Sequence, residues 1–418
     1  MLPLDETWYR RLLALAVPIG LAAGVLALLY TVVTGAGTDL FFADPGTEWW
    51  SGEWWWIPLI AVGGLLVALL RRWLKVPDDV PGAVAFAHQA WVDPSSGPRL
   101  VLVSVVSLVV GASLGPSFGL IVMGGALGSW VVTRFGDEDE EAKQEYTLTG
   151  MAGGLGAAFS SPLFAVLLTT ELSPTEKRNY VAAFIPQLIA ATLGFVVFGI
   201  TQSPILDAYE VPSYTFEYAD LFTGLVLGIF GALTLAVLLV INNVANYATG
   251  LINDSLLRGI AGGAVVGLIA FALPLTLTSG SSELKVVIDS VAVLSAGFVA
   301  AIVLGKMLAV AVSLSSGFLG GNVFPMIFIG GATGVFVHLL IPGIPLSLAV
   351  AGMMAAVPGA YLNAPLSLTL IAAATVGLNA SEIVPITIAV ATSYLCFASL
   401  RYWLQRRQQA KAALDAAS

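Results

Sequence analysis

Long apolar stretches, separated by short polar or glycine-rich segments, run through most of the chain. The first two, residues 12–33 and 57–70, are flanked by pairs of arginines, before the first and after the second. A helix needs about 20 apolar residues to cross a bilayer. The pattern predicts further membrane segments at residues 100–132, 148–170, 181–200, 221–241, 260–277, 286–314, 323–340, 347–376 and 383–404. Gly and Pro interrupt several of them, which is typical of broken membrane helices packed inside protein.

The composition excludes a soluble globular domain. Hydrophobic residues make up 58% of the 418 residues and charged ones 10%, with a mean hydropathy of +0.91, whereas soluble domains carry about 25% charged residues. We therefore expect an all-α polytopic protein in the lipid bilayer. The net charge of -9 argues against nucleic acid as a partner. With one cysteine and two histidines, neither a disulfide framework nor a metal site is expected, and no cofactor is predicted.

The flanks of the apolar segments predict an orientation. Residues 49–56 hold five tryptophans, and residues 71–75 hold three basic side chains. Indoles prefer the membrane interface, and cations favour the cytoplasmic flank of a span. The same rule puts the charged stretch at residues 136–143 and the basic stretch at residues 401–411 inside. We expect a multi-pass protein of the cell membrane with both termini in the cytoplasm.

Three short patterns recur in the same order in the two halves of the chain. The matches are residues 156–163 (GAAFSSPL) with 359–366 (GAYLNAPL), 124–128 (GGALG) with 330–334 (GGATG), and 111–116 (GASLGP) with 320–325 (GGNVFP). Their offsets are 203 (359 − 156), 206 (330 − 124) and 209 (320 − 111). Self-similarity at nearly one spacing indicates an internal duplication.

The two repeats are predicted to have opposite orientations in one membrane domain. We expect them at residues 10–203 and 217–405, followed by a short cytoplasmic tail at residues 406–418. The segment after Pro116 runs into basic residues and should end inside, whereas the segment after Pro325 meets none and should end outside. Inverted repeats with broken helices are frequent in transporters and place the binding site near the bilayer midplane.

The elements at residues 111–116 and 320–325 each carry glycine at one end and proline at the other. A helix that starts at such a break exposes its first amides, with the positive end of the helix dipole behind them. Two such ends from inverted halves would attract an anion and still release it, as conduction requires. The alternative is that these glycines only allow close helix packing.

These motifs resemble those of the CLC chloride channel and transporter family over essentially the whole membrane domain. Residues 315–325 (SSGFLGGNVFP) are similar to the family's second anion-binding motif, S-G-x-x-G-G-x-F-x-P, with the aromatic residue shifted by one. Residues 156–163 with Glu171 resemble its G-x-A-A-x-F-x-x-P-L…E helix, and residues 112–116 (ASLGP) fall where it has G-R-E-G-P. The combination is similar to a prokaryotic ion-transport branch of the family. The resemblance implies two inverted repeats with re-entrant helices, and a homodimer with one pore per subunit.

The resemblance also implies an ion pathway at the two breaks. The residues that it places there are Asp78, Ser113, Leu114, Gly115, Gly321, Asn322, Val323 and Phe324. Leu114 stands where the family has its gating glutamate; leucine carries no proton, so we expect an apolar constriction. The family's proton-relay glutamate falls at Leu172 without gaps, or at Glu171 with one gap. The pore tyrosine has no clear counterpart, and Tyr361 and Tyr402 are candidates.

Two charged residues near this pathway have alternative interpretations. Asp78 stands where the family has a chloride-coordinating serine, and a carboxylate about 4 Å from chloride costs roughly 4 kcal/mol at an effective dielectric of about 20. Either it caps the helix that begins near Pro81, or it is protonated, or the site no longer selects chloride. Lys306 lies inside a membrane segment, where it either supplies a positive field under the second element or reaches to an interface.

With neither proton carboxylate evident, we predict passive or uncoupled permeation of an anion, chloride by default, and no enzymatic activity. The alternatives are a proton-coupled antiporter that uses Glu171 and a non-conducting membrane scaffold or sensor. Residues 111–115 also match G-x-S-x-G, the nucleophile motif of serine hydrolases, with His88 or His338 as a base. In that remote alternative, Ser113 would react with a fluorophosphonate probe.

Overall fold

The computed structural model describes residues 3–42, 52–135, 139–159, 161–173, 180–203, 205 and 208–417. The predicted interfacial residues Trp49 and Trp50, and part of the charged stretch at residues 136–143, lie outside these ranges. Within them the helices are α1 (Thr7–Phe42), α2 (Trp56–Trp73), α3 (Ala83–Gln89), α4 (Gly97–Val109), α5 (Ser117–Phe135), α6 (Glu140–Ala158), α7 (Pro162–Leu172), α8 (Tyr180–Gly199), α9 (Asp220–Gly250), α10 (Ser255–Ala272), α11 (Ser281–Asp289), α12 (Ala296–Ser315), α13 (Val323–Leu340), α14 (Leu346–Leu362), α15 (Pro365–Val376) and α16 (Ile383–Ala417), with a 3-10 turn η1 at Pro274–Thr276.

The interrupted apolar segments divide into pairs of shorter helices, as their glycines and prolines predict. The segment at residues 100–132 becomes α4 and α5, and the segment at residues 347–376 becomes α14 and α15. In the first break, Gly111 has a φ of 89°, a left-handed conformation that glycine adopts without strain. Pro116, directly before α5, has no amide hydrogen to donate and is favourable at a helix start. The sequence itself therefore ends one helix and begins the next.

Nine helices in the described ranges are long and apolar enough to cross a membrane: α1, α2, α5, α8, α9, α10, α12, α13 and α16. Four shorter apolar helices, α4, α7, α14 and α15, have between 10 and 17 residues, which is too short for a span by themselves. The chain is thus a multi-pass, all-α membrane protein that combines full spans with broken helices.

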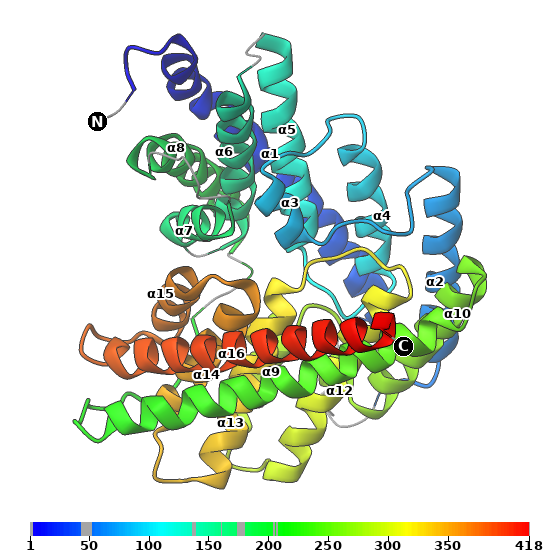
Figure 1. Ribbon diagram of the computed structural model, residues 1–418, viewed down its shortest axis with the longest axis vertical. Helices are drawn as coiled ribbons and strands as arrows, with labels where there is room; N and C mark the ends of the chain where they lie inside the picture. The colour runs from blue at the N-terminus through cyan, green and yellow to red at the C-terminus, as the bar shows by residue number, and fades with distance from the viewer. Residues whose placement is uncertain are drawn as a thin grey trace.

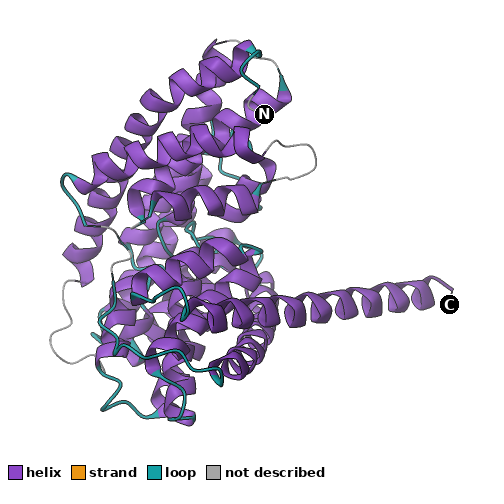
Figure 2. Cartoon of the chain, turned by 90° about the vertical axis from the view of Figure 1, so that its left-hand side faces the viewer, coloured by secondary structure: helices purple, strands orange, loops and turns teal. Residues whose placement is uncertain are grey.

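The two halves of the chain form two adjoining parts of the molecule (Figure 1). Helices α1 to α8 make up the upper part, α9 to α16 make up most of the lower part, and α2 lies beside α10 where the parts meet. The C-terminal part of α16 projects from the body, and both chain ends lie toward the same side of the view in Figure 2. Residues 406–417, expected as a short tail, continue α16 as helix.

The recurring GGxxG patterns have the same structural role in both halves. A Cβ atom on Gly124 of α5 would collide with the carbonyl oxygen of Gly150 in α6, and one on Gly330 of α13 would collide with that of Met353 in α14. Small residues let helix backbones approach this closely. Most residues of α5, α6, α13 and α14 are buried. These four helices form the interior that holds the two breaks.

Candidate functional site

The two breaks meet in the interior of the molecule. The Gly115 amide donates to the Gly321 carbonyl at 2.8 Å, and the Gly321 amide donates to the Gly115 carbonyl at 2.7 Å. The two residues form an isolated antiparallel bridge. A Cβ atom on Gly115 would come within 2.9 Å of Phe324 Cβ, and one on Gly321 would collide with the Ser117 hydroxyl. Glycine is therefore required on both sides of this contact.

Two helices begin beside the bridge. Helix α5 starts at Ser117 and α13 starts at Val323, each two residues after one of the paired glycines. The first amides of a helix have no partner within it, and the positive end of the dipole lies there. The N-cap residue of α13, Asn322, makes no side-chain capping hydrogen bond. Two positive helix ends therefore converge on one place.

The amides before these helix starts have partners within the protein. The Ser113 amide donates to Ser313 Oγ at 3.3 Å, and the Leu114 amide donates to the Ala112 carbonyl at 2.7 Å. The amides of Gly115 and Gly321 are used in the bridge. These four amides are therefore not available to bind an ion. The amides at the helix starts remain candidates, and Val323 and Phe324 stay predicted pathway residues.

Leu114 forms the boundary between the bridge and a partly polar cavity. Its side chain is 1% exposed, and a Cβ atom on Gly320 would lie 2.5 Å from Leu114 Cβ. The cavity has a volume of about 180 Å³. Six of its lining residues carry hydroxyl groups or a carboxylate and come from α1 and the turn after η1; they are Thr31, Thr34, Thr38, Asp39, Thr278 and Ser279. An apolar side chain thus lies between this partly polar cavity and the paired breaks.

Aromatic rings pack beside Gly115. The ring of Phe324 stacks on Phe159 with a centroid separation of 4.8 Å and an interplanar angle of 12°. Phe164 lies 4.5 Å from Phe159, centroid to centroid. Sequence reasoning placed Phe324 in the pathway but missed Phe159 as its partner, although Phe159 belongs to the recurring motif at residues 156–163.

Of the two candidate pore tyrosines, Tyr361 lies at the break. The Asn322 amide nitrogen Nδ2 donates to the Tyr361 hydroxyl at 3.4 Å, so the end of α14 contacts the start of α13. Tyr402 is 59% exposed on α16, where the Arg406 guanidinium lies over its ring. The structure therefore brings Tyr361, rather than Tyr402, to Asn322.

A buried lysine, Lys306, is connected to the first break through backbone carbonyls. Lys306 is fully buried, and its Nζ donates to the carbonyls of Thr276, Leu277 and Thr278 at 3.1, 3.1 and 2.7 Å. The Thr276 carbonyl also accepts a hydrogen bond from Ser113 Oγ at 2.7 Å. The alternative that Lys306 reaches to an interface is wrong, because its side chain is fully buried and three backbone carbonyls accept hydrogen bonds from it. The Thr276 carbonyl thus connects Lys306 to Ser113, the residue before Leu114.

Glu171 joins the two repeats. Both of its carboxylate oxygens accept backbone amides at the start of α15, from Leu366 at 2.7 Å and from Ser367 at 2.8 Å. A carboxylate in this position satisfies two of the amides that a helix start leaves unpaired. Leu172, the other candidate for the proton relay, is an apolar buried residue. A relay role for either position stays a prediction.

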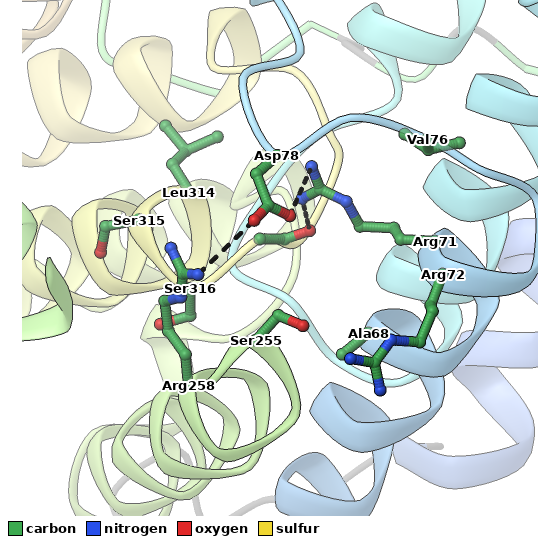
Figure 3. A pocket seen from close by; sticks show the side chains of 11 residues that line it. Ala68, Arg71, Arg72, Val76, Asp78, Ser255, Arg258, Leu314, Ser315 and Ser316 are labelled. Carbon is green, nitrogen blue, oxygen red and sulfur yellow. Dashed lines mark hydrogen bonds and ion pairs between the residues drawn. The ribbon is translucent and has the colours of Figure 1, made fainter. Parts of the chain in front are cut away.

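Asp78 lies in a second cavity, between two arginines (Figure 3). Its carboxylate is 4.0 Å from Arg71 and 3.7 Å from Arg258, and its side chain is 70% exposed. The interpretation that it caps α3 is wrong, because the N-cap residue of that helix is Gly82 and no side chain caps it. This cavity includes none of the residues at the paired breaks. Arg71 and Arg258 compensate the negative charge of Asp78, which the sequence alone places near the ion without a cationic partner.

Ser113 has the surroundings of a structural residue. It is fully buried, and its hydroxyl donates to a backbone carbonyl rather than to a histidine. A serine nucleophile needs a histidine base within hydrogen-bonding distance. His338, one of the two histidines, instead has Nδ1 at 2.7 Å from the Ile344 carbonyl. The geometry around Ser113 thus gives the hydrolase alternative no support.

Residues 76–398 match the family model described as voltage gated chloride channel. The chain belongs to this family, the CLC family. It is also similar to "Putative ion-transport protein YfeO" of Escherichia coli strain SMS-3-5 and of Shigella flexneri, in each case with 26% identity over 346 residues, which cover 80% of this chain and 81% of that protein. Membrane anion transport is therefore the activity class of this chain, and the resemblance to CLC proteins is confirmed.

Solved CLC structures share the fold. The crystal structure of a slow cyanobacterial Cl-/H+ antiporter matches with a TM-score of 0.78 at 19% identity, covering 96% of this chain and 98% of that one. A CLC-type fluoride/proton antiporter matches with a TM-score of 0.73 at 18% identity, covering 92% of this chain and 95% of that one. The predicted CLC-like architecture of inverted repeats with broken helices is thus confirmed. The repeat boundaries at residues 203 and 217 stay predictions.

Proposed function

We propose that this CLC protein lets anions, chloride by default, cross the membrane passively, without coupling to protons. The path runs through the partly polar cavity beside α1, past Leu114, to the helix starts at Val323 and Phe324. The observation that carries the proposal is the position of Leu114. An apolar side chain lies between the cavity and the bridge of the two breaks, where the family has a titrating carboxylate.

The electrostatics around this path favour an anion. The N-terminal ends of α5 and α13 converge there, and each carries about half a positive charge from its aligned peptide dipoles. Lys306, held by three carbonyls, adds positive charge when its amine is protonated. In a low-dielectric interior such charges act over longer distances than in water. Asp39, exposed in the cavity, opposes them and should reduce the rate of anion entry.

The absence of coupling rests on Leu114 and Glu171. Leucine has no proton to exchange, and the Glu171 carboxylate accepts two amides of α15. A relay through Glu171 would have to release these amides each time the side chain moved. Two of the solved structures with this fold are described as proton antiporters, one for Cl- and one for fluoride. Proton coupling and fluoride selectivity are therefore the alternatives that a flux experiment must separate.

We also propose a cell-membrane location, cytoplasmic termini and a homodimer with one pathway in each subunit. The basic residues at the C-terminal end of α2, Arg71 and Arg72, and Lys75 directly after it support the orientation through the positive-inside preference. The homodimer rests on the resemblance to CLC proteins alone. Light scattering coupled to size-exclusion chromatography of the detergent-solubilised protein would measure it, and a monomer would contradict it.

The experiment is anion efflux from liposomes that contain the purified full-length chain. Potassium chloride, bromide, nitrate and fluoride are loaded in turn, and efflux is followed after valinomycin provides a path for potassium. We expect chloride efflux well above that of protein-free liposomes. Leu114→Trp should reduce it, because a larger side chain narrows the constriction. Efflux of fluoride alone would contradict chloride as the main ion, and efflux of none would favour the scaffold alternative.

A further inference from the structure

The cavity around Asp78 is lined by an unusual set of charges. Eleven residues line it, three of them arginines, Arg71, Arg72 and Arg258, whereas Asp78 is the one acidic residue among them. Its volume is about 310 Å³. A water molecule takes about 30 Å³ in the liquid, so the cavity has room for a polyatomic ion with some of its hydration. We call it the arginine pocket.

The arginines come from two elements that are far apart in the sequence. Arg71 and Arg72 end α2, and Arg258 lies in the first turn of α10. The pair α2 and α10 packs through glycines, since a Cβ atom on Gly64 would collide with the Gly259 carbonyl oxygen. This close approach fixes the two arginine-bearing helix ends relative to each other. The pocket therefore follows from the packing of the scaffold rather than from loop conformation.

Arg71 is the fixed member of the set. It is 7% exposed, and its guanidinium donates to the carbonyls of Pro77 and Gly317, the latter at 2.7 Å. Its Nε is buried without a hydrogen-bond partner in the described part of the chain. Planar guanidinium groups match the geometry of phosphate and carboxylate oxygens. Arg71 is fixed in place and has an unused donor, Nε, so it can bind an anion with phosphate or carboxylate oxygens.

Asp78 lies in the pocket but makes no close hydrogen bond to its arginines. Its oxygens lie 4.0 Å and 3.7 Å from the nearest guanidinium nitrogens, which is longer than a charge-assisted hydrogen bond. Its side chain is 70% exposed, so it can turn away without breaking the core. Asp79, the next residue, adds a second negative charge within electrostatic range of Arg71. Three arginines still exceed these two carboxylates by one charge.

We propose that the arginine pocket is a binding site for a phosphate group, which displaces Asp78 from Arg71 and Arg258. The phosphate belongs either to inorganic phosphate or to the headgroup of an anionic phospholipid, because the same arginines would bind both. The site shares no lining residue with the cavity beside Leu114. It is thus distinct from the cavity beside Leu114.

A phosphate in the arginine pocket would affect the two turns that Arg71 contacts, at Pro77 and at Gly317. Arg71 holds the carbonyl of Pro77, which precedes the segment leading to α3, and that of Gly317, which precedes the second break. Gly317 has a φ of 97°, so this turn has a conformation that few other residues adopt. A phosphate that draws Arg71 toward it would loosen or reposition these two turns. Binding at the arginine pocket is thereby linked to the pathway without contributing to it.

The test measures phosphate binding to the purified full-length chain in detergent, at constant ionic strength, by the shift of its thermal unfolding midpoint. Inorganic phosphate is titrated first. The double variant R72Q/R258Q should bind at least about tenfold more weakly, since charge-assisted hydrogen bonds are lost. Asp78→Asn should bind more tightly than the wild type, because the competing carboxylate is gone. Arg99→Gln, an exposed arginine on α4, is the matched control and should bind like the wild type.

A second arm identifies the source of the phosphate. The same proteins are reconstituted in nanodiscs of phosphatidylcholine with or without phosphatidylglycerol, and their unfolding midpoints are compared. Stabilisation by phosphatidylglycerol that is lost in R72Q/R258Q supports the site with a lipid headgroup, even when inorganic phosphate has no effect. Equal response of the wild type and R72Q/R258Q in both arms would overturn the proposal.

Two further outcomes would also overturn it. Asp78→Asn that binds no more tightly than the wild type would show that the carboxylate does not compete. Chloride that stabilises as strongly as phosphate, with the same dependence on Arg258, would make the pocket an entrance for the permeating ion. These measurements need no ion flux, so they test phosphate binding independently of the proposed passive conduction.

Discussion

Gly115 and Gly321 exchange two backbone hydrogen bonds although 206 residues (321 − 115) separate them. Each glycine precedes a helix start in its own repeat, so this one contact aligns the two halves of the pathway. It also leaves no room for a side chain, as the collisions with Ser117 and Phe324 show. The function of the protein thus depends on a contact between two residues that have no side-chain chemistry.

Gly321→Ala should destabilise the protein by about 1–3 kcal/mol, the usual cost of overpacking an interior. The added methyl group would collide with the Ser117 hydroxyl and press on the Phe118 amide, forcing the bridge apart. Thermal unfolding in detergent measures the effect. Gly297→Ala is the control, because nothing lies within 4 Å of a Cβ atom there. Equal stability of both variants would mean that the bridge is not a tight contact.

Leu114→Glu should make anion flux depend on pH. An ionised carboxylate at the constriction would compete with the anion, and protonation would remove this competition, so flux should rise by about tenfold as the pH falls from about 7.5 to 5. Leu114→Gln, with a similar shape and no charge, should stay independent of pH. Efflux from liposomes over this pH range gives the comparison. A Leu114→Glu protein with abundant, pH-independent flux would place residue 114 outside the path.

Asp39→Asn should raise the rate of anion flux by about twofold at low ionic strength, since a charge roughly 10 Å away repels an anion by a few tenths of a kcal/mol in water. Salt at about 1 M should abolish the difference through screening. Asp5→Asn removes an exposed charge before α1 and serves as the control. If both variants raised the flux equally, the cavity beside Leu114 would not be the place where anions enter.

Lys306→Met should destabilise the protein by about 2–4 kcal/mol, because the carbonyls of Thr276 to Thr278 would lose their buried donor. Lys285→Met, at an exposed lysine of α11, should change the stability by no more than about 0.5 kcal/mol. Chemical or thermal unfolding measures both. A Lys306→Met protein as stable as Lys285→Met would show that the ammonium group does not hold this turn.

Glu171→Gln should lower the stability by about 0.5–2 kcal/mol, since a charged acceptor at the start of α15 is replaced by a neutral one. Chloride flux and its response to pH should stay unchanged. Parallel measurements of unfolding and of efflux separate the two roles. A loss of proton movement in Glu171→Gln, with chloride flux retained, would instead assign the residue to a proton relay.

The sequence predicted the elements of this fold better than the contacts between them. Gly111, Pro116 and Gly320 mark the breaks because glycine and proline act locally on the backbone. The packing of Gly124 and Gly330 could be expected from their recurrence. The bridge of Gly115 with Gly321 could not, since a pairing over 206 residues depends on how the two halves dock.

The same limit applies to the charged residues. From the sequence, Arg71 can be interpreted only as a basic flank of a membrane segment, whereas in the structure it is buried and hydrogen-bonded to two turns. Asp78 was expected near the ion because a motif was aligned there, and its arginine partners come from α2 and α10. Glu171 was considered as a relay, and its carboxylate is bound to α15. Gly317, Arg258 and the amides of α15 lie far along the chain from the residues that they contact, and local sequence patterns cannot identify such partners.

Proton movement driven by a chloride gradient tests the central claim most directly. Liposomes with the purified chain are prepared with unequal chloride and equal pH, and the external pH is recorded when chloride is allowed to flow. With leucine at position 114, we predict chloride movement without any proton flux that persists against a proton gradient. Protons pumped uphill in a fixed ratio to chloride would contradict the account and make this chain a coupled antiporter.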